Sequence, residues 1–173
     1  LAKWPEHLQI YTGQNLDEAI IHERKIHIDE HPYSQLHTPM SIQRAELQNI
    51  QFMDPISGNL QHTSISYSKF NDLIAVDMRH TRLDTVDLQE RRLERVDFRH
   101  ARLRNVNFEK SHLFNVNFEG AILSWCHFEG AMYDESTIWP VNFDYKNSGA
   151  FGPDAVLCEK DFRYLTLEGH HII

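Results

Sequence analysis

The sequence predicts an all-β solenoid, and two spacings in the middle of the chain are the basis of this prediction. The first spacing is a repeat of five residues, in which every fifth position, called a centre, holds a large apolar residue. The second lies within each repeat: two positions before most of the centres stands a small or β-branched residue, such as Val86, Val96 or Val106. Two inward residues separated by one outward residue indicate a short strand, whereas a period of five fits neither a longer strand nor an α-helix. The chain is therefore predicted to turn a corner every five residues. The centres are thirteen consecutive positions, five residues apart, that hold only Leu, Met, Phe or Tyr: Leu73, Met78, Leu83, Leu88, Leu93, Phe98, Leu103, Phe108, Leu113, Phe118, Leu123, Phe128 and Tyr133.

Corners near 90° close a square after four pentads, so coils of about 20 residues would stack about 4.8 Å apart, like neighbouring strands. Side chains twenty positions apart are then expected to lie on top of one another. The centres from Met78 to Phe128 are predicted to line a dry interior, where burying each large side chain contributes roughly 1.5–3 kcal/mol.

Three pentads show the repeat most clearly: Val-Asp-Phe-Arg-His at 96–100, Val-Asn-Phe-Glu-Lys at 106–110 and Val-Asn-Phe-Glu-Gly at 116–120. They resemble the pentapeptide-repeat family, whose loose pattern is a small residue, Asp or Asn, Leu or Phe, a polar residue and often Gly. The resemblance covers residues 45 to 134 with one interruption. It implies a right-handed parallel quadrilateral β-helix, and it is specific to the fold rather than to a function.

The N-terminal flank, residues 1–44, is expected to cap one open end of the solenoid, because a solenoid otherwise exposes the apolar ends of its core. Asn15 followed three residues later by Glu18 is typical of a helix start. The sequence therefore predicts a short capping helix from residue 15 to about residue 27.

The repeat array is assigned to residues 45–135, with looser coils expected at 53–59 and 70–73. A turn-prone Asp-Pro-Ile-Ser-Gly segment interrupts the first of these places, and a slip of two residues interrupts the second. Residues 136–173 are expected to form an irregular C-terminal cap and tail. In many family members the corresponding aromatic residues, here beginning at Trp139, fold over the end of the core.

Composition excludes several classes of protein. The formal charge of −8 argues against a general nucleic-acid binder. No apolar run approaches the 18 or so residues of a membrane span, and no secretory signal opens the sequence. Cys126 and Cys158 are too few for a disulfide framework and lack metal-ligand spacing. A reduced compartment is therefore expected, with the cytoplasm favoured.

No enzyme is predicted, and no catalytic, cofactor or metal site. The inward positions are almost wholly apolar, which excludes a buried acid–base pair, and Cys126 belongs to a column of small core residues. Arg91 is the exception, an inward cation expected at a corner with its guanidinium in solvent; a role in partner binding is the alternative. A histidine-rich stretch is interpreted as surface residues, with metal binding as the alternative: His22, His27, His31 and His37.

The outward positions offer two interpretations. One is a solvated face of mixed charge, in which exposed pairs contribute about 0–1 kcal/mol each. The other is a binding patch for an acidic partner that includes two outward aromatic residues, Phe114 and Trp125, unless these pack under a flanking segment. The basic residues of that patch would be Arg79, Arg82, Arg99, Arg102 and Arg104.

The predicted function is that of a scaffold that presents rigid faces to a protein partner. Neither nucleic acid nor a membrane is expected among its partners, and the prediction is compatible with a homodimer. The family resemblance supplies an alternative, a DNA mimic that modulates DNA gyrase and confers quinolone resistance. Such a mimic needs acidic surface along the whole coil. Residues 73–110 instead carry nine Arg or Lys against seven Asp or Glu, while residues 111–135 carry four acids and no Arg or Lys. The alternative therefore ranks second.

Overall fold

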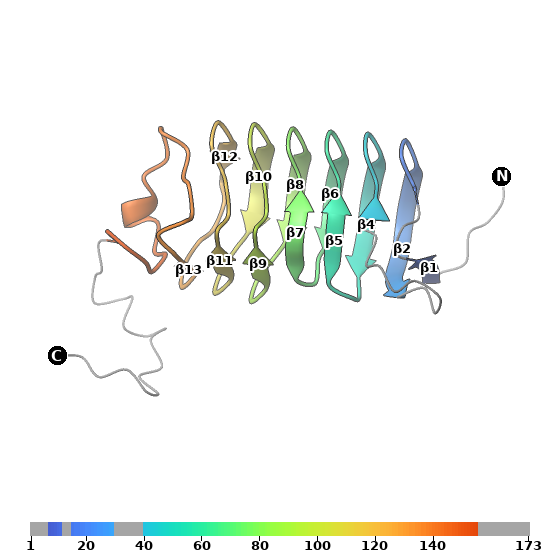
Figure 1. The fold of residues 1–173 in the computed structure, drawn as a ribbon, viewed down its shortest axis with the longest axis horizontal. Coiled ribbons are helices and arrows are strands. Elements are labelled where there is room, and N and C mark those ends of the chain that lie inside the picture. Colours follow the sequence, from blue (N-terminus) through green and yellow to red (C-terminus); the bar gives the residue numbers. More distant parts are fainter. Residues whose placement is uncertain (1–6, 12–14, 30–39, 156–173) are drawn as a thin grey trace.

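The computed structural model describes residues 7–11, 15–29 and 40–155, which form a parallel β-solenoid (Figure 1). Its strands pair in two parallel sheets. The first sheet has the order β1 (His7–Tyr11), β2 (Ile20–Asp29), β4 (Glu46–Phe52), β6 (Ser64–Lys69), β8 (Arg82–Asp87), β10 (Arg102–Asn107) and β12 (Ile122–Ser124). The second has the order β3 (Met40–Ser41), β5 (Ile56–Asn59), β7 (Leu73–Asp77), β9 (Arg92–Glu94), β11 (His112–Phe114) and β13 (Met132–Tyr133). The helix among the described residues is a single 3₁₀ turn, η1 (Tyr145–Asn147), and no described helix is long and apolar enough to cross a membrane.

The corners of the coil come from one backbone conformation that recurs every fifth residue. At these positions φ lies between 52° and 72°, in the left-handed region, where the chain bends at a corner of the coil. Glycine reaches this region without penalty, and Asn tolerates it better than most residues. Each pentad therefore combines a short strand, which carries the two inward residues, with one left-handed residue that forms the corner. The left-handed residues of the array are Ala75, His80, Thr85, Glu90, Arg95, His100, Asn105, Lys110, Asn115, Gly120, Trp125 and Gly130.

Asp and Asn at alternate pentads fix these corners with their side chains. Each carboxylate or amide oxygen accepts the backbone N–H of the residue two positions on, at 2.8–3.2 Å. Such Asx turns supply a partner for an N–H that would otherwise be unsatisfied at the bend. The residues are Asp77, Asp87, Asp97, Asn107 and Asn117.

Coil length changes along the solenoid, close to the irregularities that the sequence predicts. Arg82 pairs in register with Arg102, twenty residues on, whereas Ser64 pairs with Arg82, eighteen residues on. The register also shifts between Ile56 and Gly58, where φ of the glycine is 132° and a Cβ atom would lie 2.0 Å from a backbone oxygen of β3. The irregular coil predicted at 53–59 is confirmed.

The predicted interior is confirmed: each of the eleven core positions from Met78 to Phe128 is at most 1% exposed, except Leu123. Leu123 is partly buried because β12 is the edge strand of its sheet. The phenylalanines of alternate pentads stack in two columns. Phe98 and Phe118 have ring centroids 5.2 Å apart and an interplanar angle of 6°, and Phe108 and Phe128 lie 4.8 Å apart at 4°.

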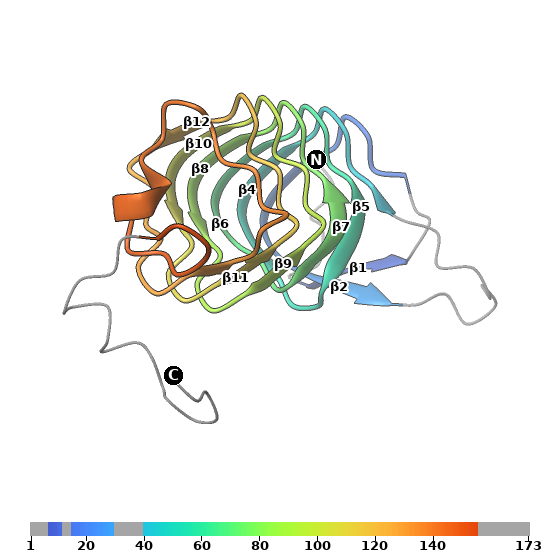
Figure 2. The ribbon, with the colours of Figure 1, turned by 60° about the vertical axis from the view of Figure 1, so that its left-hand side comes forward.

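The C-terminal segment closes the end of the core, as the sequence predicts. The Trp139 ring stacks on Phe118 at 5.3 Å, and Tyr145 stacks in turn on Trp139 at 5.5 Å. Phe143 packs against Phe128 at 5.3 Å. Figure 2 brings this segment forward, in orange and red, at the end of the coil. The tail predicted at the C-terminus lies, from residue 156, outside the described residues.

The predicted N-terminal helix is wrong. Its residues form the turn and strand β2, which pairs in parallel with β4, so the solenoid begins before residue 45. Asn15 does accept the N–H of Asp17, at 2.8 Å, but in an Asx turn of the kind found at the corners of the array. Glu18 has φ of 63°, which starts a corner and not a helix. An Asn followed three residues later by a Glu occurs both at helix starts and at corners of the coil. Here the corner forms because β2, which is rich in Ile, pairs with β4.

Candidate interaction surface

The strands β8 and β10 of the first sheet carry three exposed arginines, and Trp125 follows the neighbouring strand β12. Arg82 and Arg102 occupy paired register positions on neighbouring coils, and both are exposed. Asp84 and Arg104 are paired in the same way two residues later. Together, Arg82, Arg102, Arg104 and the adjacent Trp125 are called the basic-aromatic patch below. The stacking that the sequence predicts for these pairs is confirmed.

Charge on the patch is only weakly neutralised. Arg82 and Arg102 form no ion pair with any residue that the structure describes. The Arg104 guanidinium lies 3.5 Å from Asp84 and 5.3 Å from the centroid of the Trp125 ring. Two guanidinium groups of the same sign at paired positions on neighbouring coils repel each other, and an anionic ligand would relieve this repulsion. The face can therefore attract a carboxylate-rich segment.

Two arginines of the sequence-predicted patch lie at the adjoining corner and are neutralised there. Arg79 binds Asp77 through Nε at 3.0 Å and Nη2 at 2.7 Å, and Arg99 binds Asp97 in the same way. Burial opposes ionisation of Asp77, but hydrogen bonds from the Arg79 side chain and backbone and from Gln61 outweigh it. The pKa of Asp77 consequently lies below its ordinary value.

A column of imidazoles separates these ion pairs from the patch. His62 and His80 stack with centroids 4.9 Å apart, and His80 and His100 stack at 5.2 Å, as the sequence predicts for the second pair. The column ends on Gly120, where a Cβ atom would lie only 2.6 Å from Nδ1 of His100.

The two predicted aromatic anchors lie on different sheets. Trp125 follows β12 and is 72% exposed, so no described flanking segment covers it. Phe114 ends β11 in the second sheet, is half-buried, and contacts the His112 ring at 5.6 Å. A surface that joins Trp125 to the arginines therefore leaves out Phe114.

Sequence reasoning missed Tyr67, which is 61% exposed and lies on β6 in the same sheet. It lines an open groove with Asn49, Lys69 and Thr85. Tyr67 and Thr85 are eighteen residues apart and both occupy left-handed corners. A coil of eighteen residues places Tyr67 beneath Thr85, whereas the coil of twenty residues assumed from the sequence does not pair these two positions.

Arg91 occupies an inward position because of the change in coil length. Leu88 and Leu93 are five residues apart, whereas the corresponding residues of the coil below, Phe70 and Leu73, are three apart. The coil below therefore has no residue at the position that corresponds to Arg91. The Arg91 side chain lies beside Phe70 and lines a shallow hollow there. It is half-buried, and its Nε has no hydrogen-bond partner among the described residues.

The remaining predicted residues divide by placement. Cys126 packs in the column of small residues, where burial raises its pKa to about 11. Of the histidine-rich stretch, His22 is exposed and lies 4.0 Å from Glu46. The side chains of His27, His31 and His37 lie outside the described part of the chain.

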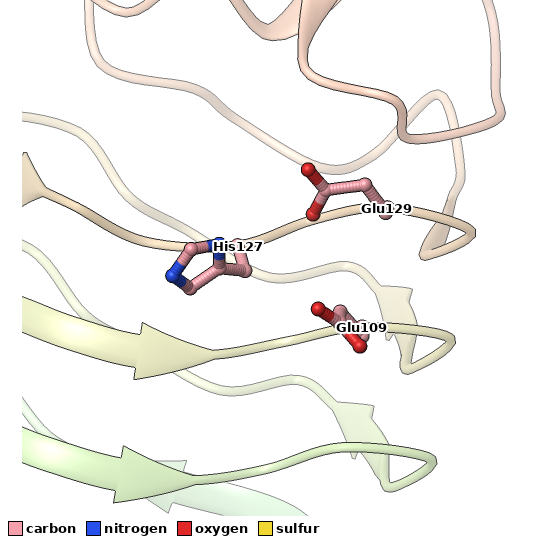
Figure 3. Close-up of side chains that lie close together, drawn as sticks. All are labelled: Glu109, His127 and Glu129. Carbon is pink, nitrogen blue, oxygen red and sulfur yellow. The ribbon is translucent and has the colours of Figure 1, made fainter.

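One group of side chains has the composition of a metal site. Glu109, His127 and Glu129 point outward from two neighbouring coils, and one ligand atom of each lies within 4.8 Å of the other two (Figure 3). Sequence reasoning missed this group, although Glu109 and Glu129 are one coil, twenty residues, apart. The spacing would have indicated two stacked carboxylates.

The family model for pentapeptide repeats matches residues 92–130 in eight copies. Among solved structures, the chain is similar to the pentapeptide repeat protein Rfr23 of the cyanobacterium Cyanothece 51142, with 18% identity, 76% of this chain and 88% of that chain covered, and a TM-score of 0.42. It is similar to HetL, a protein involved in heterocyst differentiation regulation in Nostoc sp. strain PCC 7120, with 12% identity, coverage of 88% and 92%, and a TM-score of 0.32. A trypsin-treated form of QnrB1, a plasmid-mediated fluoroquinolone resistance protein, shares 13% identity over 84% and 91%, with a TM-score of 0.28. Among curated proteins, no sequence matches this chain.

Proposed function

We propose that this chain, whose residues 92–130 match the model for pentapeptide repeats, is a non-enzymatic scaffold that binds an acidic segment of a protein partner on the basic-aromatic patch. The observation that carries the proposal is that Arg82 and Arg102 occupy paired positions on neighbouring strands, are exposed, and form no ion pair with a described residue. Hollows on the described surface, such as the groove beside Tyr67, are open to solvent, as expected of a surface that binds another protein.

The backbone of the coil supports binding because it holds these side chains in fixed rows. Arg82 and Arg102 each stand on a strand that is hydrogen-bonded to both neighbouring strands. Little backbone entropy is lost when a partner docks on such a surface. Trp125 adds a large exposed ring beside Arg104, and Trp and Arg are the residue types that most often dominate binding energy at interfaces.

The DNA-mimic alternative is disfavoured by the same residues. A surface that imitates the DNA phosphate backbone presents regularly spaced negative charge, whereas β8 and β10 present Arg82, Arg102 and Arg104 over two consecutive coils. A DNA gyrase supercoiling assay with and without a quinolone separates the two functions. The scaffold proposal predicts no change in supercoiling or in quinolone inhibition at micromolar protein, and protection of gyrase would overturn it.

Charge reversal on the patch tests the scaffold proposal. Arg82→Glu/Arg102→Glu is expected to abolish retention of partners from the native host on the immobilised chain, and Trp125→Ala to weaken it. Arg95→Glu is the matched control, because Arg95 is 56% exposed but belongs to the second sheet, beside β9. Binding of wild-type protein should also weaken steeply with salt. Retention that is unchanged by the double charge reversal, or that falls equally with Arg95→Glu, would exclude the patch.

A further inference from the structure

Glu109, His127 and Glu129 converge at one corner of the solenoid and include no residue of the basic-aromatic patch. His127 and Glu129 lie on one coil and Glu109 on the coil beneath (Figure 3). Glu109 is half-buried, and the other two side chains are exposed. Their positions are set by the backbone, since the N–H of Phe108 donates to the carbonyl of His127 at 2.8 Å and that of Lys110 donates to the carbonyl of Glu129 at 3.0 Å.

Local turns hold the two coils in this register. Glu109 is fixed by an Asx turn, in which its N–H donates to the Asn107 side chain at 2.9 Å. Asn107 in turn lies directly below His127, with which it forms a parallel bridge. Gly149 packs against Glu129 from the other side, where a Cβ atom would lie 3.3 Å from Cα of the glutamate. The backbone of each of the three residues is therefore held in place by contacts within or between the coils.

The two carboxylates lack a counter-charge in the described structure. Neither Glu109 nor Glu129 forms an ion pair with a described residue, and the ammonium of Lys110 lies 3.7 Å from Glu90 instead. Like charges stacked on adjacent coils repel each other, whereas a cation between them would be attracted by both. An open hollow lined by Asn105, Asn107, Glu109 and His127 gives an ion and its water ligands access to the group.

From this arrangement we propose that Glu109, His127 and Glu129 form a binding site for a first-row divalent transition metal, with Zn²⁺ as the representative ion. Two carboxylate oxygens and one imidazole nitrogen are a donor set that Zn²⁺ accepts in four-coordinate sites. Ca²⁺ and Mg²⁺ prefer oxygen ligands alone, so the imidazole selects against them. Ligand atoms of a tetrahedral Zn²⁺ are about 3.4 Å apart, which the exposed side chains of His127 and Glu129 can reach by a small rotation.

This inference is independent of the proposed scaffold function, and it predicts a stabilising effect. An ion held by both coils would tie the coil of β10 to the coil that precedes the C-terminal cap. An ion that binds only the folded chain raises its melting temperature as its concentration increases.

Zn²⁺ titration of the full-length chain tests the site by isothermal calorimetry. Wild-type protein is expected to bind with micromolar affinity, and His127→Ala or Glu109→Gln/Glu129→Gln to bind one Zn²⁺ fewer, or at least tenfold more weakly at this site. Glu119→Gln is the matched control, since Glu119 forms the same Asx turn with Asn117 two corners away. The control should bind as wild type does. Circular dichroism verifies that each variant is folded.

A second readout does not depend on stoichiometry. Co²⁺ added to ¹⁵N-histidine-labelled protein should shift or broaden the imidazole signal that disappears in His127→Ala, before any other histidine signal. Three results would overturn the proposal: no Zn²⁺ binding below millimolar concentration, binding unchanged in both ligand variants, or a Co²⁺ effect that spares His127.

Discussion

Truncation of one core ring, Phe108→Ala, is the most direct test of the stacked interior. Phe108 is fully buried, stacks on Phe128 at 4.8 Å, and makes edge contacts with Phe98 at 6.3 Å and Phe118 at 5.9 Å. Replacing a buried Phe by Ala destabilises by about 3–5 kcal/mol, depending on how far the site collapses. Collapse is limited here, because backbone hydrogen bonds fix the spacing of the coils above and below. We therefore expect about 4–5 kcal/mol.

The assay is urea unfolding followed by circular dichroism and by tryptophan fluorescence. Trp139 stacks on Phe118 in the C-terminal cap, so its fluorescence reports on the end of the array next to the cavity. Ile122→Ala provides the control, since Ile122 is 56% exposed and its truncation should change the free energy of unfolding by less than about 0.5 kcal/mol. A loss below about 1 kcal/mol for Phe108→Ala, or one equal to the control, would refute a rigid stacked interior.

Three further predictions concern the corners and two titrating groups. Ala75→Gly should raise the free energy of unfolding by about 0.5–1 kcal/mol, because Ala75 has φ of 54° and glycine adopts that conformation without penalty; a lower melting temperature would contradict this. Asp77→Asn should destabilise the fold at pH 7. Since folding lowers the pKa of Asp77, the difference from wild type should shrink as pH falls below about 3.9 and be lost as pH falls through the lower pKa of the folded state; a difference that does not change with pH would be inconsistent with the Arg79 ion pair. In a Cys158→Ser variant, iodoacetamide should alkylate Cys126 at least a hundredfold more slowly than a free thiol at pH 8, because a pKa of about 11 leaves roughly one thiolate in a thousand; alkylation at the rate of a small thiol would show that the column is open.

The repeat and its interior could be predicted from the sequence because the information is local. Each pentad carries its own inward pair, and residues such as Gly120 and Asn105 carry its corner. Phe98, Phe108 and Phe118 recur at a fixed spacing, and in a closed coil with five residues per corner all residues at that spacing face the interior. The same logic correctly predicted the stacking of Arg82 on Arg102.

Local signals were insufficient where two structures share one signature. Asn15 and Glu18 suit both a helix N-cap and a corner of the coil, and only the pairing of β2 with β4 selects the corner. Arg91 shows the same limit. Its inward position is explained by the coil beneath, which is shorter at this corner.

The sequence by itself thus determined the fold, the core and which side chains face outward, because these depend on a period of five residues. Tertiary structure decided which outward residues meet beyond the pairs that are twenty positions apart on neighbouring coils. Coil lengths of eighteen and twenty residues bring Tyr67 into the same sheet as Trp125, leave Phe114 on the other sheet, and join Glu109 to His127 and Glu129. Contacts between coils depend on register, and register is set only when the coils stack and their backbone hydrogen bonds form.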